Sequence, residues 1–331
     1  MQKMSQLNLG IIGYRNHSKK LISIIRKNSK INQIISFCYK KNKIKTLNKK
    51  NKFENIKYTS NLKDLNNLDL IVISSATGSH IEYLKKFVHK VKYIYCEKPA
   101  GCNIGEVNYL KSLNPNIKKK IFFGQNILYS DLFHQIKKIK KKNLFGKPLY
   151  ASINICNGIS FKKSMDQNWR FNSRLVFKKI TGNVGIHYLG MLRSIFGKIN
   201  KLSIKEFGIN KKNKIDNSFL DIEFSNKLIS KIYLSYSTIA FEEIKLYFTN
   251  GLLVFDGKKL YSHFPRDIFD IDGNFKKPKK KIIKIFDKSW SNNSIENTIN
   301  FFLKNCLLNK GFKIKDYNNF LEILNLFLKR K

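Results

Sequence analysis

A glycine-containing turn near the start of the chain carries residue types that could hold phosphate groups. The turn, residues 10–18 (GIIGYRNHS), lies between an apolar run that predicts a strand and an amphipathic stretch that predicts a helix. Such a turn brings backbone N–H groups and the positive end of a helix close to a bound pyrophosphate. Gly13 fits the first glycine of the pattern G-x-G-x-x-G, whereas Arg15 stands at the second glycine and Ser18 at the third. Alone, this segment fits a dinucleotide site and an ordinary strand–helix turn equally well.

Two further polar segments follow buried strands in the first third of the chain. Residues 74–80 (SSATGSH) come at the end of one apolar run, and Glu97 and Lys98 come at the end of another, 91–96. Ligands of open α/β sheets bind outside the carboxyl ends of the strands, so the three polar segments are expected to converge on one crevice. Judged by composition alone, Lys98 would be one more surface lysine in a lysine-rich chain.

The elements that would position these residues form two groups. Up to about residue 125, short strands rich in Ile, Val and Leu alternate with helical patterns, which predicts a parallel sheet covered on both faces. After a helix at 129–141, strands follow one another with partial polar/apolar alternation, and helices are expected at 183–196 and at the end of the chain. We therefore expect an α/β Rossmann domain over 1–125 and an α/β domain with a mainly antiparallel open sheet over 126–331.

The charge of the chain is strongly positive. It has 64 Lys and Arg residues against 22 Asp and Glu, a formal net charge of +42, yet only seven of the basic residues are arginine. Dedicated nucleic-acid surfaces favour arginine and interleaved aromatic rings, whereas these lysines lie along nearly every polar face. A solvated lysine surface is therefore expected rather than a specific nucleic-acid site, although the lysine runs at 137–142 and 276–281 keep nucleic-acid binding open as a rival.

Other features of the composition exclude several classes of site. The five cysteines form no C-x-x-C pair and no zinc spacing, so neither a disulfide framework nor a metal site is expected. No apolar run approaches the roughly 20 residues that span a bilayer, and the first residues do not have the pattern of a signal peptide. A cytoplasmic protein with no membrane partner is the expectation.

Taken together, the segments resemble the Gfo/Idh/MocA family of oxidoreductases, which includes glucose–fructose oxidoreductase, inositol dehydrogenase and their relatives. The resemblance covers almost the whole chain and runs from the glycine turn through 77–80 (TGSH), 97–99 (EKP), 126–129 (NILY), 146–148 (GKP) and 169–171 (WRF) to 185–187 (GIH). It implies an NAD(P)-dependent dehydrogenase or reductase that acts on the CH–OH group of a sugar, cyclitol or nucleotide-sugar. It also implies a C-terminal domain that binds substrate and pairs through its open sheet face in a homodimer or homotetramer.

The resemblance assigns a role to individual residues. Lys98 is similar to the family's active-site lysine, which holds the substrate oxygen near the nicotinamide, and the bond to Pro99 is often cis in the family. His187 resembles the catalytic histidine, a residue type whose ordinary pKa suits proton transfer, although on its own it would be taken for a core histidine. The implied cofactor-binding residues are Gly10, Gly13, Tyr14, Arg15, Lys40, Ser75, Thr77, His80, Glu97 and Lys98. The implied substrate residues are Lys98, Asn126, Tyr129, Trp169, Arg170, Asn183 and His187.

Several positions depart from the family pattern. Asn183 and Gly190 stand where aspartates are usual, and Leu128 stands where an arginine often follows the family's asparagine. With Arg15, these departures motivate an alternative, a catalytically degenerate relative that binds a dinucleotide or a sugar. The end of the second strand, residues 38–41 (CYKK), has no carboxylate for the ribose hydroxyls. Its lysines favour NADP over NAD, with NAD as the alternative.

Overall fold

The computed structural model describes residues 6–163, 177, 179–209, 215–286 and 290–329. The chain divides into two compact units, which are described separately here. One comprises Met1–Gln125 together with Ile295–Leu324, and the other comprises Asn126–Ser294 together with Asn325–Lys331. Among the described residues, no helix is both long enough and apolar enough to cross a bilayer.

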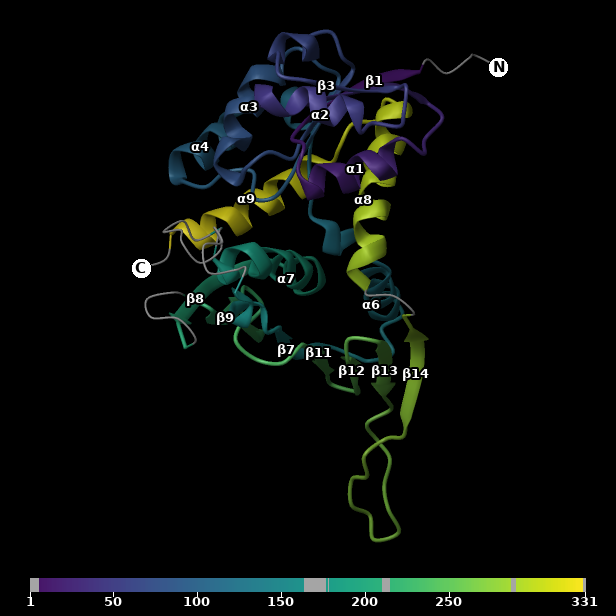
Figure 1. Ribbon diagram of the computed structural model, residues 1–331. Coiled ribbons are helices and arrows are strands. Elements are labelled where there is room, and N and C mark those ends of the chain that lie inside the picture. Colours follow the sequence, from purple (N-terminus) through teal and green to yellow (C-terminus); the bar gives the residue numbers. More distant parts are fainter. Residues whose placement is uncertain (1–5, 164–176, 178, 210–214, 287–289, 330–331) are drawn as a thin grey trace, which may run out of the picture. The chain divides into compact units, whose positions relative to one another are not determined.

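The first unit is built on a parallel sheet of six strands (Figure 1). In chain order these are β1 (Leu7–Ile12), β2 (Ile31–Phe37), β3 (Ile56–Thr59), β4 (Leu70–Ile73), β5 (Tyr93–Cys96) and β6 (Ile121–Phe123). They lie side by side in the order β3-β2-β1-β4-β5-β6, the order of doubly wound dinucleotide-binding folds. Their apolar side chains are buried, which explains why the strands appear in the sequence as continuous apolar runs. The predicted Rossmann fold is confirmed.

Helices and short 3-10 turns connect these strands. They are α1 (Asn16–Ile25), α2 (Ile44–Lys49), α3 (His80–Phe87), α4 (Ile104–Ser112), α5 (Pro115–Lys118) and the 3-10 turns η1 (Lys41–Lys43), η2 (Leu62–Leu65) and η3 (Thr77–Ser79). The lysine-rich residues 40–52 include η1 and α2. Neither element buries a residue, so the lysine-rich stretch gives no amphipathic signal in the sequence.

The helices near the end of the chain are α8 (Trp290–Leu307) and α9 (Ile314–Leu328), and most of both belongs to the first unit. This differs from the expected domain range of 126–331. The reason is aromatic packing on β6: the Phe122 ring lies 4.9 Å from that of Phe312, and the Phe123 ring lies 4.5 Å from that of Phe320. Offset ring pairs of this kind add to the burial of large apolar surfaces. The change of unit after Gln125, by contrast, coincides with the expected boundary.

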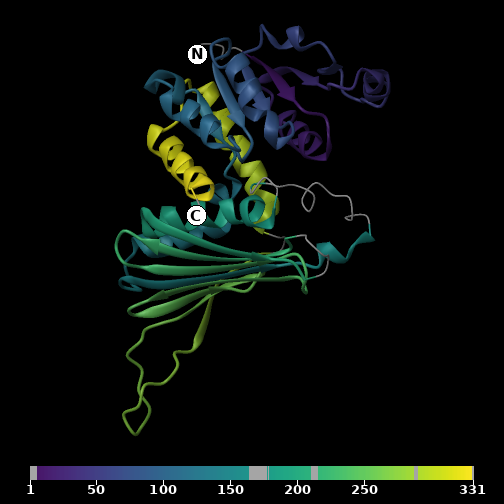
Figure 2. The ribbon, with the colours of Figure 1, turned by 90° about the vertical axis from the view of Figure 1, so that its left-hand side faces the viewer.

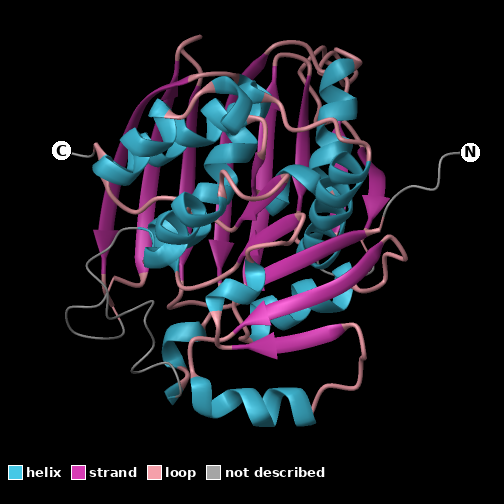
Figure 3. Cartoon of the chain, turned by 90° about the horizontal axis from the view of Figure 1, so that it is seen from above, coloured by secondary structure: helices cyan, strands magenta, loops and turns pink. Residues whose placement is uncertain are grey.

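The second unit carries an eight-stranded sheet, whose strands run side by side in Figure 3. The strands are β7 (Pro148–Cys156), β8 (Ile199–Phe207), β9 (Asn217–Phe224), β10 (Ile229–Ser235), β11 (Phe241–Phe248), β12 (Gly251–Phe255), β13 (Lys259–His263) and β14 (Lys280–Ile285). Their order is β14-β13-β12-β11-β7-β10-β9-β8. All neighbours are antiparallel except β7 and β10, which run parallel, so the mainly antiparallel sheet is confirmed as a mixed one.

Helical segments cover one face of this sheet, as Figure 2 shows for α7 (Ile180–Phe196). The others in this unit are η4 (Asn126–Tyr129), α6 (Asp131–Lys141) and η5 (Ile159–Phe161). A Cβ at Gly185 of α7 would lie 3.3 Å from Leu220 and 3.4 Å from Leu234, so glycine lets the helix approach the sheet closely. On the other face, aromatic side chains pair across strands, with the Phe219 and Tyr233 rings 4.7 Å apart.

Replacing Phe122 by alanine tests the anchoring of the C-terminal helices. The ring is 6% exposed and contacts Phe302 and Phe312, so Phe122→Ala should lower the free energy of unfolding by about 3–5 kcal/mol. Urea denaturation followed by circular dichroism measures it. Ile271→Ala, at a fully exposed position, is the control and should cost no more than about 0.5 kcal/mol. Equal losses in the two variants would show that these helices are not held through Phe122.

Candidate functional site

The glycine turn has a backbone that only glycine fits. Gly13 has a φ of +143°, and a Cβ there would overlap the Ser18 hydroxyl and come within 2.8 Å of the Ser74 carbonyl oxygen. The same hydroxyls link the turn to the end of β4, with Ser18 Oγ and Ser74 Oγ 2.9 Å apart. The Gly13 carbonyl accepts a hydrogen bond of 2.8 Å from the Ser36 hydroxyl of β2. The turn is therefore held tightly by two neighbouring strands.

The N-terminus of α1 opens directly from this turn. Arg15 is the N-cap residue with φ −81° and ψ −176°, and its side chain makes no capping hydrogen bond. The first turn of α1 has no acidic residue, so neither a capping oxygen nor a carboxylate compensates the positive end of the helix. Because Arg15 has extended backbone, arginine fits there without strain. The first N–H groups of α1 and the glycine turn form the kind of cradle that binds phosphate.

Four side chains gather beside this helix end, at the carboxyl end of β2. The guanidinium of Arg15 donates to the Tyr39 hydroxyl over 3.4 Å, so it is turned toward β2 rather than across the turn. The Tyr14 and Tyr39 rings meet edge to face at 5.9 Å, and Lys40 Nζ lies 5.9 Å from the centre of the Tyr39 ring. The interaction with Tyr14, then the charges of Lys40 and Arg15, lower the pKa of Tyr39 below its ordinary value. The predicted residues Tyr14, Arg15 and Lys40 thus form one basic cluster around Tyr39.

Glu97 lies at the end of β5 and is 6% exposed. Its carboxylate accepts hydrogen bonds from the Tyr95 hydroxyl and the His17 ring, both at 2.8 Å, and from the Lys98 backbone N–H at 3.3 Å. Burial alone would raise the pKa of Glu97, but the charge and hydrogen bond of His17, with Tyr95 and Lys98, bring it down to about 2. Glu97 therefore ties α1 to β5, and His17 is a site residue that the sequence did not reveal.

Lys98 follows Glu97 and is half-buried, and its peptide bond to Pro99 is cis, as the resemblance implies. The Pro99 carbonyl lies 2.8 Å from His80 Nδ1, and the Ser75 carbonyl lies 3.2 Å from His80 Nε2. Burial lowers the pKa of His80, which favours a neutral ring that donates at its shorter contact. His80 is 2% exposed. The shorter contact joins the start of α3 to the backbone after β5, and the cofactor contact expected of His80 stays a prediction.

The remaining predicted residues of the first unit are placed as follows. Gly10 lies inside β1, where a Cβ would come within 2.6 Å of Ile71 and 2.9 Å of Leu68. The absence of a Cβ therefore lets these side chains pack against the strand, and the cofactor contact expected of Gly10 stays a prediction. Ser75 and Thr77 are half-buried at the end of β4, where the Ser79 hydroxyl donates to that of Ser75 over 2.9 Å.

Gln125, at the end of the first unit, is a further polar residue that the sequence did not single out. It is 7% exposed, and its side-chain Nε2 has no hydrogen-bond partner within the described part of the chain. A buried amide without a partner is costly and usually marks a place where a ligand or water binds. Only burial, which the sequence does not show, distinguishes Gln125 from the other polar residues after β6.

The predicted residues of the second unit gather around α7. The start of α7 is fixed by Glu206 of β8, which accepts hydrogen bonds from Thr181 Oγ1 at 2.5 Å and Lys179 Nζ at 3.1 Å. Asn183 and His187 are one helical turn apart and both half-buried, and Asn183 Nδ2 lies 3.4 Å from the Tyr236 hydroxyl. The turn η4, which carries Asn126 and Tyr129, packs against the same helix.

The other predicted residues either lie outside the described residues or are separated between the two units. Trp169 and Arg170 fall outside the described residues. Gly190 is buried in α7, three residues after His187. Lys98 and His187, the two expected catalytic residues, belong to different units. Within the described ranges, no group of three or more His, Cys, Asp or Glu side chains is placed to hold a metal ion.

A parallel sheet in doubly wound order, a glycine turn and an uncapped helix end define a Rossmann-type dinucleotide-binding class. Residues 7–125 match the family model described as "Oxidoreductase family, NAD-binding Rossmann fold", and residues 133–254 match the GFO/IDH/MocA C-terminal domain. The chain belongs to the GFO/IDH/MocA oxidoreductase family.

Individual relatives are distant in sequence. Oxidoreductase P35 of Formosa agariphila is 22% identical over 216 residues, which are 60% of this chain and 63% of that protein. Myo-inositol 2-dehydrogenase of Thermotoga maritima is 26% identical over 82 residues, a quarter of each protein. The chain thus spans less than two thirds of the length of either of these curated relatives.

Solved structures share the fold over nearly the whole chain. Myo-inositol 2-dehydrogenase from Lactobacillus plantarum superposes with a TM-score of 0.78 at 16% identity, covering 98% of this chain and 95% of that one. A levoglucosan dehydrogenase in complex with NADH and levoglucosan gives a TM-score of 0.78 at 15% identity, with the same coverage.

The pair of His17 and Glu97 predicts a pH-dependent contribution to stability. Folding lowers the pKa of Glu97 to about 2. The Glu97 carboxylate therefore stabilises the fold above its ordinary pKa of 4.5, and this stabilisation is lost as the pH falls toward 2. The charge of Glu97 raises the pKa of His17. His17 therefore stabilises the fold below its ordinary pKa of 6.5, and this stabilisation is lost as the pH rises through the raised pKa. His17→Ala should therefore have a lower free energy of unfolding than the wild type. This deficit should be largest at about pH 5.5, on the order of 1–3 kcal/mol, and smaller at about pH 9.

Urea titrations at the two pH values measure this deficit. His134→Ala is the matched control, because His134 is exposed on α6 and makes no ion pair in the described chain. A deficit of His17→Ala that is the same at both pH values would refute the ion pair.

Proposed function

We propose that the protein is an NAD(P)-dependent oxidoreductase that transfers a hydride between the nicotinamide and a CH–OH carbon of a sugar, cyclitol or nucleotide-sugar. The observation that carries the proposal is the turn at Gly13, where a Cβ would fill the space between β1, Ser18 and Ser74. The turn leads into α1, whose N-terminus has no capping side chain, at the carboxyl end of the parallel sheet. Membership of the family supports the reaction class, and the dehydrogenases among the similar structures support a sugar-like substrate.

The described residues fit a dinucleotide. Gly13 and the first N–H groups of α1 would hold the pyrophosphate, with Ser75 and Thr77 beside it at the end of β4. The adenosine end would lie near Tyr14, Arg15, Tyr39 and Lys40. No carboxylate occurs between Phe37 and Phe53, so the usual acidic partner of the ribose 2′-hydroxyl is missing. Arg15 and Lys40 instead present two cations to a 2′-phosphate, which supports NADP as the preferred cofactor.

Cofactor preference is tested by titrating the protein with NADPH and NADH and following nicotinamide fluorescence. Replacing Arg15 and Lys40 together by alanine should weaken NADPH binding by about 10-fold to 100-fold, because hydrogen bonds to charged groups are worth about 1.5–3 kcal/mol. NADH binding should change by no more than about threefold. Lys43→Gln, at an exposed lysine of η1, is the control. Equal weakening of both cofactors would argue against recognition of a 2′-phosphate, and failure to bind either would argue against a dinucleotide site.

For the reaction, we propose Lys98 and His187 as the catalytic residues. Hydride transfer is the chemistry that a nicotinamide dinucleotide would supply when bound. Lys98 binds the substrate oxygen through its ammonium group and polarises the bond to carbon. His187 takes the hydroxyl proton during oxidation and returns it during reduction. Asn126, Tyr129 and Asn183 orient the sugar hydroxyls from η4 and α7, and Trp169 and Arg170 are proposed as further substrate contacts. Because Asn183 has no charge, it does not raise the basicity of His187 as a carboxylate at that position would.

These roles predict the kinetics of two variants on a substrate that the wild type turns over. Lys98→Ala and His187→Asn should each lower kcat by about 100-fold or more, the usual contribution of general acid–base and electrostatic groups. Stopped-flow or steady-state absorbance of NAD(P)H measures it, and NADPH titration of His187→Asn should match the wild type. Unchanged turnover of Lys98→Ala would refute the mechanism. A wild-type protein that binds NADPH yet is silent on a broad panel of sugars and cyclitols would favour the degenerate binding protein that Asn183 and Gly190 suggest.

The bare sheet face of the second unit supports self-association as a homodimer or homotetramer. Besides Phe219 and Tyr233, it carries Tyr150 and Tyr247, whose rings lie 5.5 Å apart. Aromatic residues are enriched in the cores of protein interfaces. Light scattering coupled to size-exclusion chromatography determines the assembly.

A further inference from the structure

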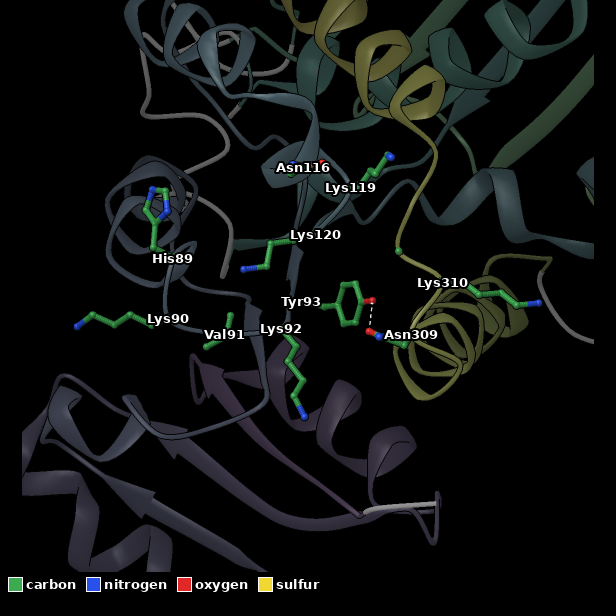
Figure 4. A pocket seen from close by; sticks show the side chains of 11 residues that line it. His89, Lys90, Val91, Lys92, Tyr93, Asn116, Lys119, Lys120, Asn309 and Lys310 are labelled. Carbon is green, nitrogen blue, oxygen red and sulfur yellow. Dashed lines mark hydrogen bonds between the residues drawn. The ribbon is translucent and has the colours of Figure 1, made fainter. Parts of the chain in front are cut away.

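A second polar pocket lies in the first unit, at the amino ends of β5 and β6. Its volume is about 490 Å³, and Figure 4 shows the side chains that line it. It lies at the opposite end of the parallel strands from the glycine turn. Three segments form it: the residues before β5, the residues before β6 and the connection between α8 and α9. Five lysines line it, and no aspartate or glutamate does. None of the residues proposed for cofactor binding contributes.

The walls of the pocket are fixed by the backbone. The N–H of Phe312 donates to the Lys119 carbonyl over 2.9 Å, which joins the α8–α9 connection to the residues before β6. Gly311 has a φ of +64°, and a Cβ there would lie 3.0 Å from the Lys119 carbonyl oxygen. The Phe312 ring packs on Tyr93 at 5.8 Å. The connection is therefore held against the sheet by a close approach that requires glycine.

The centre of the pocket consists of hydrogen-bonding groups. Tyr93 is 7% exposed, and its hydroxyl donates to Asn309 Oδ1 over 2.7 Å, which leaves the amide N–H groups of Asn309 as donors. In Figure 4, Lys92 and Lys120 flank Tyr93, while Lys90, Lys119 and Lys310 lie around the rim.

The charge of the pocket is largely uncompensated. Lys92 pairs with Asp69 at 2.8 Å, but the other four lysines make no ion pair within the described part of the chain. Lys120 Nζ has only a long contact of 3.4 Å with the Val88 carbonyl. Ammonium groups and amide N–H groups can only donate hydrogen bonds, so the best ligand is one that consists of acceptors and carries several negative charges.

We propose that this pocket binds a small anion with two or more phosphoryl groups. The volume lies within the range of small-molecule sites, about 300–1,000 Å³, and phosphate oxygens supply the acceptors and charges that the lining lacks. A phosphate chain occurs both as free inorganic polyphosphate and within nucleoside triphosphates. A nucleic-acid strand fits less well, because the Tyr93 ring is buried and His89 is the one exposed ring in the lining on which a base could stack.

Isothermal titration with inorganic triphosphate at about 0.15 M NaCl tests the proposal. We expect saturable binding of one triphosphate per chain. Lys120→Gln with Lys310→Gln should weaken it by about 10-fold or more, since each lost phosphate contact costs about 1 kcal/mol or more. Lys276→Gln with Lys277→Gln removes the same charge from the exposed β13–β14 connection in the other unit and should change binding by less than about twofold. Equal weakening in both double variants, or binding without saturation, would overturn the proposal.

A substitution that changes one heavy atom tests the pocket without disturbing the fold. Asn309→Asp preserves the shape of the side chain and an acceptor for Tyr93 but adds a negative charge, so triphosphate binding should fall by about 10-fold or more. Unchanged binding in Asn309→Asp would overturn the site. If ATP binds at least as tightly as triphosphate, and the same variants lose this binding, the ligand is a nucleoside triphosphate. If ATP binds more weakly than triphosphate, the ligand is a free phosphate chain. A single-stranded oligonucleotide that displaces triphosphate and binds more than about 10-fold tighter would assign the pocket to nucleic acid instead.

The proposal is separable from the dinucleotide site. NADPH titration of Lys120→Gln with Lys310→Gln and of Asn309→Asp should match the wild type, because these residues lie at the other end of the strands. The double variant Arg15→Ala with Lys40→Ala, which should lose NADPH binding, should likewise bind triphosphate at this pocket as the wild type does.

Discussion

The buried carboxylate of Glu97 is the constraint on which the first unit's site depends. A buried carboxylate is costly unless several donors compensate it, and here the donors come from α1, from β5 and from the backbone of Lys98. The same cluster dictates Gly124, because a Cβ there would overlap the Tyr95 hydroxyl. The end of β6 must therefore approach the pair closely. One charged group thus fixes the helix after the glycine turn and the backbone position of Lys98.

This arrangement explains how the glycine turn accommodates an unusual residue. The second glycine of the pattern normally leaves room for a pyrophosphate, and arginine would fill that room if its side chain crossed the turn. The extended backbone of Arg15 and its contact with Tyr39 direct the guanidinium toward the end of β2. His17 meanwhile is drawn toward β5 by Glu97. The two basic side chains on either side of the helix start therefore point apart and leave the N–H groups between them uncovered.

Much of the fold followed from the sequence, and the errors have definite physical causes. Buried parallel strands such as β1 and β4 form continuous apolar runs, and so they were predicted. β14 is an edge strand rich in lysine and α2 buries nothing, so neither has an apolar pattern that the sequence could show. The C-terminal helices were assigned to the second domain because chain order does not show which aromatic rings meet on β6.

The site residues divide in the same way. Lys98 and Gly13 lie at strand ends and belong to ordered motifs, so a pattern in the sequence reveals them. The partnership of His17 with Glu97 spans 80 residues and leaves no local pattern. His80 lies in a motif, yet its two ring nitrogens face backbone carbonyls, so its motif position reflects a structural role. Proximity in space and burial are the two properties that no spacing along the chain encodes.

The positive charge of the chain gains meaning only from such geometry. At physiological salt, charges more than about 8 Å apart are screened, so +42 spread over a surface attracts anions without selecting among them. Selection requires cations held beside fixed donors in a shaped space. Arg15 and Lys40 beside Tyr39 meet that condition at one end of the parallel strands, and Lys92 and Lys120 beside Tyr93 meet it at the other. The lysine-rich surface would then raise the rate of encounter with anions, while these two clusters are where we propose that selection takes place.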